Sequence, residues 1–281
     1  MINVTFAAMG TGVDAWCRDP ESADGLRGWF EEVEDVCSRF RPGSELSRVN
    51  RSPAGEVVVS DLLAEVLTAA DWMRSVTGGL VDAGVGAGVS GWGYDKSFDE
   101  GLGLDAAPSH IPSPSWSLTG RRLSRSPGTH IDLGGVAKGW ACDRAVEQRL
   151  ATVVSAGGDI RSSDPRTFVS LVDPWDQVAV RLHLGVGALA TSSTTRRRWK
   201  VGNREVCHLI DPRTMSPVDT PILSATVLAR SAVEAEAGAK AVLIRGEDGL
   251  AWAAETDWIA EAVVVWSDGS VYATPGIDVA A

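Results

Sequence analysis

Cysteine is scarce in this sequence, and its spacing excludes several kinds of site. The 281 residues include four cysteines, and no two of them form a C-x-x-C pair: Cys17, Cys37, Cys142 and Cys207. Such pairs are typical of structural zinc and of thioredoxin-like redox sites, so neither is supported. Four cysteines in a chain of this length do not indicate a disulfide scaffold either. We expect buried free thiols.

Long apolar segments are also lacking. No apolar run approaches the roughly 18–20 residues that a membrane-spanning helix needs. At the N terminus no basic stretch precedes an apolar one, and the residues Asn3-Val4-Thr5-Phe6 are typical of a strand. We therefore expect no secretory signal, no lipid anchor and no membrane partner, which predicts a cytoplasmic protein.

Positive charge is in deficit, because the formal net charge is −11. A surface of this sign repels a nucleic-acid backbone, so the sequence argues against DNA or RNA as a partner. The basic residues gather in two clusters, which either receive an anionic ligand or form solvated loops. These clusters are Arg39, Arg41 and Arg48, and then Arg196, Arg197, Arg198 and Lys200.

What the sequence does contain is the composition of a packed protein, with 44% hydrophobic and 22% charged residues. The patterns predict helices at about 23–37, 61–76 after the N-cap Ser60, 137–150 and from 232. They predict strands at 152–155, 168–172, 180–184, 207–210 and 224–229, and a last hairpin at 262–265 and 271–273. Residues 38–50 are expected as a loop, and residues 82–128 as a loop with short extended pieces. The irregular alternation of helices and strands favours an α+β fold.

Two glycine-containing segments are candidates for contact with a ligand. In Asp132-Leu133-Gly134-Gly135, the glycines lead into the helix that carries Lys138. Backbone N–H groups at such a helix start favour an anion such as a pyrophosphate, but the segment is equally typical of a tight turn. In Gly157-Gly158-Asp159, the glycines leave room for a flat ring and Asp159 has an acceptor for a ring N–H. A plain turn is the alternative there.

A histidine and a hydroxyl pair complete the candidates. His208, on the expected strand before Asp211-Pro212, is either a general acid or base or a structural histidine. Thr191 and Ser192 precede the second basic cluster and suit either phosphate contact or a polar turn. The remaining histidines indicate no metal cluster.

Taken in order, these segments resemble the FAD:protein FMN transferase family, also called the ApbE or thiamine-biosynthesis lipoprotein family. The resemblance covers most of the chain. It rests on seven elements in the expected order: Met9-Gly10-Thr11; 38–50; Thr77 to Asp82 with Trp92-Gly93-Tyr94; Ile131 to Gly139; Ala156 to Asp159; Ala190-Thr191-Ser192; and His208 to Thr214.

The resemblance implies a single α+β domain over residues 1–281, made of two mixed α/β lobes around an FAD cleft. It implies transfer of FMN from FAD to a threonine of an acceptor protein, with release of AMP and with magnesium at the pyrophosphate. His208 is then the candidate catalytic base, and the Ala137 carbonyl is a candidate metal ligand. The candidate flavin-site residues are Met9, Thr11, Asp82, Lys138, Gly157, Gly158, Asp159 and Thr191.

Two positions depart from the family pattern. An aspartate and a threonine four residues apart usually bind the metal, and here Glu236 and Lys240 stand in their places. Glutamate can bind a hard cation, whereas an ammonium cannot. Three arrangements follow. Lys240 turns away while Glu236 and Ala137 hold magnesium; or Lys240 pairs with Glu236 and contacts the pyrophosphate in place of the metal; or the two form an ion pair on the helix surface.

This departure keeps other activities open. A protein without the metal could bind FAD as a carrier or sensor without transferring FMN. A third alternative is an FAD pyrophosphatase, which uses water as the acceptor. The sequence contains no D-x-x-[ST]-[GA]-T acceptor segment, so modification of the chain by itself is not expected.

Overall fold

The N-terminal residues alternate between buried and more exposed side chains, as strands at the side of a sheet do. Strands β1 (Ile2–Ala8) and β2 (Thr11–Cys17) form an antiparallel hairpin. Its turn has positive φ at both Met9 and Gly10. Strand β2 buries Val13, Ala15 and Cys17 on one face, so this face belongs to the core.

The computed structural model describes residues 1–96, 102–172 and 178–277. The chain divides into two compact units, each assembled from separate stretches of sequence. Unit 1 comprises Met1–Glu31, Lys138–Thr195 and Thr220–Ala281, and unit 2 comprises Glu32–Ala137 and Arg196–Asp219. The assignment of residues 1–281 to a single domain stays a prediction.

Unit 1 is built on an eight-stranded antiparallel sheet in the order β1-β2-β7-β8-β11-β16-β17-β18. The remaining strands of this sheet are β7 (Val153–Ala156), β8 (Asp159–Ser162), β11 (Gly187–Ser193), β16 (Ile222–Ala229), β17 (Ile259–Trp266) and β18 (Val271–Ala273). A separate hairpin is formed by β9 (Phe168–Val172) and β10 (Val178–His183).

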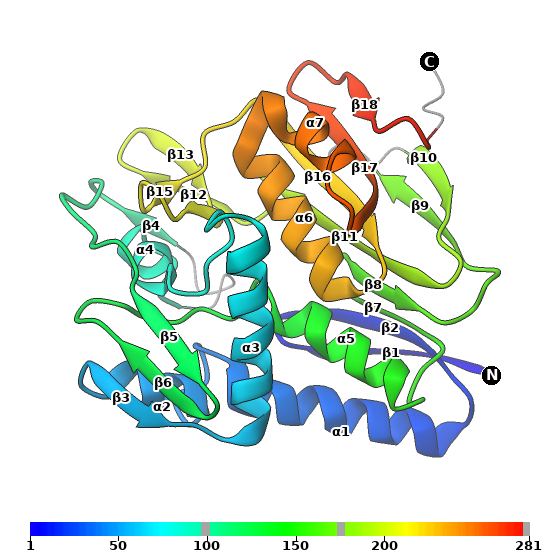
Figure 1. Cartoon of the computed structure of the whole chain (residues 1–281), viewed down its shortest axis with the longest axis horizontal. Helices are drawn as coiled ribbons and strands as arrows, with labels where there is room; N and C mark the ends of the chain where they lie inside the picture. The colour runs from blue at the N-terminus through cyan, green and yellow to red at the C-terminus, as the bar shows by residue number, and fades with distance from the viewer. Residues whose placement is uncertain (97–101, 173–177, 278–281) are drawn as a thin grey trace. The chain divides into compact units, whose positions relative to one another are not determined.

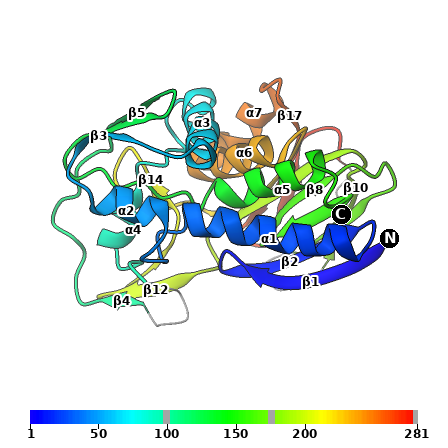
Figure 2. The same cartoon turned by 90° about the horizontal axis from the view of Figure 1, so that it is seen from below.

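Helices cover one face of the unit 1 sheet, as Figures 1 and 2 show for α5 and α6. The helices are α1 (Pro20–Cys37, which continues into unit 2), α5 (Ala137–Glu147), α6 (Ala232–Arg245) and α7 (Gly249–Ala254), with a 3₁₀ turn at Gly246–Asp248. Helix α6 packs against β11 and β16, and Gly238 approaches the side chain of Val227. The hairpin β9–β10 packs in a second apolar cluster with Leu189 and Val263.

The described residues of unit 2 form helices and three small sheets, in the strand orders β3-β6-β5, β13-β12-β4 and β14-β15. Its helices are α2 (Glu45–Arg51), α3 (Asp61–Val76) and α4 (Gly86–Gly91). Its strands are β3 (Gly55–Val58), β4 (Gly103–Leu104), β5 (Trp116–Thr119), β6 (Arg122–Arg125), β12 (Arg198–Val201), β13 (Arg204–Cys207), β14 (Ile210–Asp211) and β15 (Ser216–Pro217).

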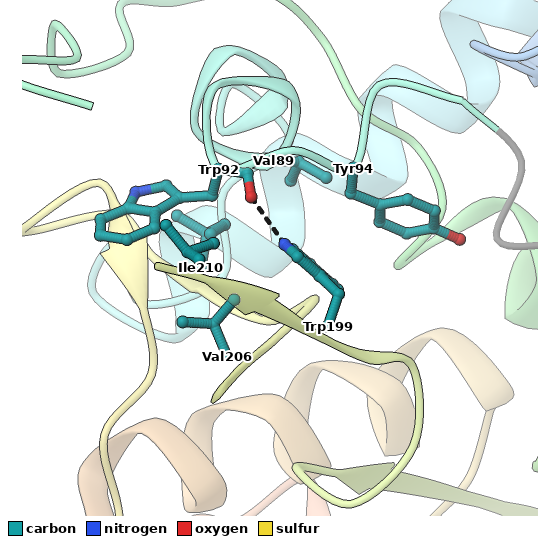
Figure 3. Packing of buried hydrophobic residues seen from close by; sticks show 7 residues of the cluster. Val89, Trp92, Tyr94, Trp199, Val206 and Ile210 are labelled. Carbon is teal, nitrogen blue, oxygen red and sulfur yellow. Dashed lines mark hydrogen bonds between the residues drawn. The ribbon is translucent and has the colours of Figure 1, made fainter. Parts of the chain in front are cut away.

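An aromatic cluster forms one core of unit 2 (Figure 3). It combines helix α4 and the residues after it with strands β12 to β14, in the set Val89, Trp92, Tyr94, Trp199, Val201, Val206 and Ile210. Trp199 donates Nε1–H to the Trp92 carbonyl at 2.7 Å, and Trp92 donates its own Nε1–H to the Met215 carbonyl at 2.9 Å. Both indoles are therefore buried with their polar atoms satisfied, as aromatic residues with a polar handle require.

The α+β class expected from the sequence is confirmed, and so are the four buried free thiols. Helix α3 begins after Ser60, whose hydroxyl accepts from Leu63 N–H, as expected. The expected loop over 38–50 is wrong, because α2 begins at Glu45. The short extended pieces expected within 82–128 are present as β4 to β6, whereas helix α4 was not expected there, and residues 97–101 lie outside the described residues. In the part of the chain that is described, no helix has the length and apolarity to cross a bilayer.

Candidate functional site

Helix α5 carries Lys138 next to the sheet of unit 1. Its Nζ lies 3.0 Å from Oδ2 of Asp159, at the start of β8. The side chains are 12% and 2% exposed, so the carboxylate is buried and the lysine partly buried. Asp159 and Lys138 are both sequence-predicted site residues, and the structure brings them together.

Helix α6 carries a second ion pair of the same kind, with a buried carboxylate and a partly buried lysine. Lys240 Nζ donates to Glu236 Oε1, one helical turn earlier. Their side chains are 15% and 4% exposed. The lysine therefore turns toward Glu236 rather than away from it, and the pair lies inside unit 1 rather than on the helix surface.

The two ion pairs act on each other electrostatically. The pKa of Asp159 is raised to about 6, because burial and the Glu236 carboxylate raise it by more than Lys138 and Lys240 lower it. The pKa of Asp159 thus depends on the charges of Lys138, Glu236 and Lys240. We refer to Lys138, Asp159, Glu236 and Lys240 as the charge cluster.

The turn before Asp159 brings two strands close together. Gly157 and Gly158 join β7 to β8 with φ of 63° and 105°, a region that favours glycine. A Cβ at Gly157 would lie 2.6 Å from Thr11 Oγ1, so only glycine fits beside that hydroxyl. The sequence-predicted residues Thr11, Gly157 and Gly158 therefore share one corner of unit 1.

Thr191 lies on a different face of the sheet from helix α6. In β11 it pairs with Thr226 of β16, and the two hydroxyls are 2.8 Å apart. Side chains alternate along a strand, so Thr191 shares its face with Leu189 and not with Ala190. Ala190 pairs with Val227, whose side chain contacts α6. Thr226 is a neighbour that the sequence reading did not single out.

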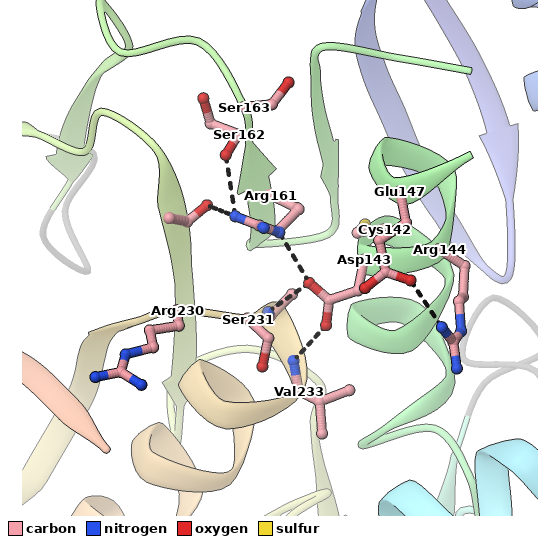
Figure 4. A network of polar contacts seen from close by, with 12 residues as sticks. Cys142, Asp143, Arg144, Glu147, Arg161, Ser162, Ser163, Arg230, Ser231 and Val233 are labelled. Atoms are coloured by element: carbon pink, nitrogen blue, oxygen red, sulfur yellow. Dashed lines mark hydrogen bonds and ion pairs between the residues drawn. The ribbon is translucent and has the colours of Figure 1, made fainter. Parts of the chain in front are cut away.

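The start of helix α6 is fixed by a polar network (Figure 4). Ser231 and Glu234 form a capping box. The buried carboxylate of Asp143 accepts from the backbone N–H groups of Ala232 at 2.8 Å and Val233 at 3.1 Å. Arg161 Nε lies 3.3 Å from the same carboxylate. Burial raises the pKa of Asp143 to about 6, and the ionised form at neutral pH is held by these donors.

Asp143 thereby positions the helix that carries Glu236 and Lys240. We expect Asp143→Ala to lower the free energy of unfolding by about 2 kcal/mol, because two buried N–H groups and Arg161 lose their acceptor. Urea denaturation followed by circular dichroism measures this. Asp24→Ala on helix α1, which removes an exposed carboxylate, is the control. Equal midpoints for the two variants would contradict this assignment.

His208 lies in unit 2, between strands β13 and β14. The strand expected over 207–210 is wrong, because β13 ends at Cys207 and His208 occupies a bend. The carboxylate of Asp211 accepts from the backbone and guanidinium of Arg213. Asp211 therefore stabilises the turn that follows it. This turn continues into Met215, whose φ is 53°.

Asp82, also in unit 2, accepts hydrogen bonds that connect neighbouring segments of the fold. Its Oδ1 accepts from Gly84 N–H and from Trp116 Nε1–H, both at 2.7 Å. The indole of Trp116 is buried, so this hydrogen bond fixes β5 to the segment before α4. No local pattern points to Trp116 as the partner of Asp82, because the two residues are 34 positions apart.

In the first basic cluster, Arg39 interacts with other side chains of the protein. Arg39 Nε lies 2.8 Å from Asp132 Oδ2, and its guanidinium lies over the rings of Phe40 and Tyr94. The other oxygen of Asp132 accepts from Gly134 N–H. One donor of the glycine pair is thus already engaged by an acid of the chain. Arg39 also lines a cavity of about 200 Å³, together with Ser47, Asn50, Arg51, Gly86, Ser90, Asp95, His130 and Ile131.

The predicted site residues therefore fall into two groups. Unit 1 carries Met9, Thr11, Lys138, Gly157, Gly158, Asp159, Thr191, Glu236 and Lys240. Unit 2 carries Asp82, His208 and Ala137, the last being the first residue of α5. The FAD cleft expected from the sequence stays a prediction.

Comparison with protein-family models gives a match to the ApbE family over residues 9–264. Among curated proteins, the FAD:protein FMN transferase of Vibrio cholerae serotype O1 is 27% identical, over 85% of this chain and 78% of that protein. The FAD:protein FMN transferase of Rhodobacter capsulatus is 29% identical, over 98% of this chain and 57% of that protein.

Solved structures support the same fold. A crystal structure of the ApbE protein from Thermotoga maritima superimposes with a TM-score of 0.84, covering 98% of this chain and 97% of that one at 24% identity. The flavin transferase ApbE from Vibrio cholerae superimposes with a TM-score of 0.78, with the same coverage and identity.

Proposed function

The chain belongs to the ApbE family, and from that premise we propose that it moves FMN from FAD to a threonine hydroxyl of an acceptor protein and releases AMP. The observation that carries this proposal is the family match over residues 9–264, together with curated relatives that are named for this reaction. FAD is then the substrate, and a second protein is the partner.

In the proposed reaction, the threonine oxygen attacks the phosphorus on the FMN side of the pyrophosphate. A new P–O bond forms, the bond to the bridging oxygen breaks, and AMP leaves with that oxygen. The threonine proton passes to a base, for which we propose His208. Because such phosphoryl transfers depend on positioning and on neutralising phosphate charge, cations of the chain are central to the mechanism.

The residues proposed for FAD divide by chemistry. Lys138 has an ammonium for a phosphate oxygen. A Cβ at Gly158 would meet only the Thr191 carbonyl oxygen within 4 Å, at 3.7 Å, so the backbone at this position has room for a flat ring. Met9, Thr11, Asp82, Asp159 and Thr191 remain candidates for the flavin site on the family resemblance.

Magnesium fits the donors of this chain poorly. Of its expected side-chain ligands, Glu236 is engaged by Lys240, and Lys240 cannot coordinate as an ammonium. In residues 1–96, 102–172 and 178–277, no three His, Cys, Asp or Glu side chains are grouped so as to hold a metal. We therefore derive no step through a metal.

Incubation of the purified protein with FAD and a candidate acceptor protein tests the proposal. We expect the acceptor to gain the mass of FMN less one water, and AMP to appear in equal amount. An acceptor with its threonine replaced by alanine is the control and should gain nothing. AMP and free FMN released at the same rate without acceptor would instead identify an FAD pyrophosphatase. FAD binding with neither product would identify a carrier or sensor.

A further inference from the structure

Two threonine hydroxyls meet on the face of the unit 1 sheet that is opposite helix α6. Thr191 of β11 pairs with Thr226 of β16, and their Oγ1 atoms are 2.8 Å apart. Either hydroxyl has the geometry to donate at this distance. The two side chains differ in burial, since Thr226 is 6% exposed and Thr191 is half-buried. This difference decides which of them is the donor.

The burial of Thr226 sets the direction of the hydrogen bond. A buried hydroxyl that does not donate costs free energy, because its proton has left water without gaining a new acceptor. Among the described residues, the Thr226 hydroxyl has a single hydrogen-bond partner, the Thr191 oxygen. Thr226 is therefore the donor and Thr191 the acceptor. The Thr191 hydroxyl proton then has no acceptor in the part of the chain that is described, and it is available to a ligand.

The other neighbours of Thr226 on this face are apolar. Val263 of β17 lies opposite Thr226, and Leu228 follows two residues later on the same face. Both belong to the apolar cluster that packs under the hairpin β9–β10. Valine has the shape of threonine and would suit such surroundings without a polar atom. The hydroxyl at this position therefore serves its hydrogen bond to Thr191 and not the packing of the sheet.

Thr191 lies beside the glycine turn that joins β7 to β8. The only described atom within 4 Å of a Cβ placed on Gly158 is the Thr191 carbonyl oxygen. A flat ring that lies on this turn has Thr191 as its neighbour. The isoalloxazine ring of a flavin carries carbonyl oxygens and ring nitrogens that accept hydrogen bonds. A hydroxyl that is free to donate suits these atoms.

We propose that Thr226 is a positioning residue of the flavin site, because its hydrogen bond to Thr191 makes the Thr191 hydroxyl a donor to a carbonyl oxygen or nitrogen of the flavin ring. The inference rests on the proposed function in taking FAD as the ligand. Thr226 itself does not contact FAD and acts through Thr191. The pair thus recognises the ring of the substrate rather than its phosphates.

Calorimetric titration of FAD into the Thr226→Val variant is the first test. We expect binding about threefold to tenfold weaker than in the wild type, the range that a neutral hydrogen bond contributes. Thr226→Ser keeps the hydroxyl and should restore wild-type affinity. Thr167→Val is the matched control, because Thr167 forms another hydroxyl pair in unit 1, at 2.7 Å from Ser162. The control should bind FAD as the wild type does.

A double-mutant cycle with Thr191→Val separates positioning from a general loss of stability. Once Thr191 has no hydroxyl, the replacement of Thr226 should cost no further affinity. The visible absorption spectrum of bound FAD is a second measure, because a hydrogen bond to the ring shifts its bands. We expect the same spectral change in both single variants and none in Thr167→Val. Losses of affinity that add in the double variant would overturn the proposal, because the two residues would then act independently.

The donor direction is tested in the wild-type protein, so this result does not depend on any variant folding. Hydroxyl protons that are held in hydrogen bonds exchange slowly with water and are followed by nuclear magnetic resonance. We expect the Thr226 proton to be protected in the free protein, and the Thr191 proton to be protected only after FAD is added. A protected Thr191 proton and an unprotected Thr226 proton before FAD is added would reverse the direction and overturn the proposal.

The outcomes separate this inference from the proposed function. Wild-type affinity in Thr226→Val, with an unchanged circular dichroism spectrum, would overturn the role of Thr226 and leave the transfer reaction standing. Failure of the wild type to bind FAD would instead overturn the proposed function, and with it this inference.

Discussion

Replacement of His208 by Asn is expected to slow FMN transfer about 10²- to 10⁴-fold, the range that a positioned general base contributes. Asparagine keeps a polar side chain of similar size but has no basic nitrogen near neutral pH. FAD binding should persist in this variant, because the phosphate contact proposed for FAD comes from Lys138. Transfer to the acceptor protein is followed by mass spectrometry, and FAD affinity by calorimetry.

A matched control is available in the same chain. His183 on β10 is exposed, and its Nε2 lies 2.7 Å from the Pro165 carbonyl. His183→Asn should transfer FMN at the wild-type rate. Should His208→Asn lose FAD affinity in proportion to the transfer rate, His208 would be a binding residue and not the base. A rate equal to that of the wild type would remove it from the reaction.

Trp199→Ala has the largest effect that we expect on folding, a loss of about 3–5 kcal/mol in the free energy of unfolding, which is typical for truncating a buried tryptophan. The indole is 5% exposed and packs in the aromatic cluster of unit 2 (Figure 3). The variant would lose this packing and would leave the Trp92 carbonyl without the Nε1–H donor. Trp199 also pairs with Val206 across β12 and β13, one residue before Cys207.

Hydrogen exchange measured by mass spectrometry localises the effect. Faster exchange is expected in β12 and β13 of unit 2, and with it loss of the order around His208. Trp199→Phe keeps most of the apolar volume and should cost clearly less. Trp16→Ala removes a half-exposed indole in unit 1 and serves as the control. A loss below about 1 kcal/mol in Trp199→Ala would mean that the aromatic cluster relaxes around the cavity.

Local signals account for the parts of the fold that the sequence predicted well. Helix α3 follows from the N-cap at Ser60, which is a local signal. The capping box of Ser231 and Glu234 at the start of α6 is a local signal of the same kind. Helix α2 was missed although Ser44 caps it. Its residues are mostly polar, and its stability depends on burying Leu46 and Val49 within unit 2, which no local pattern reveals.

In the candidate site, too, contacts between residues close in sequence are predictable and long-range contacts are not. The pair of Glu236 with Lys240 was predictable because residues four apart share a helix face. The pair of Lys138 with Asp159 joins a helix to a strand 21 residues later, and Thr191 meets Thr226 across 35 residues. Such contacts depend on strand order and register, which a single sequence does not specify. His208 was placed on a strand because the apolar pattern around it continues through Ile210, whereas the backbone bends there.

The order of the sequence segments that form the two units affects how the nascent chain folds on the ribosome. Unit 2 is complete once residues 196–219 have been made, but unit 1 still lacks β16 to β18 and α6 at that point. The hairpin β1–β2 of unit 1 gains its neighbour in the sheet when β7 has been made. The sheet is complete only after the last quarter of the protein has been made. Domains generally fold as they emerge, so unit 2 is expected to close while unit 1 remains open. A ribosome that stops at residue 219 would therefore release a chain with one finished unit, and that chain would lack both Glu236 and Lys240.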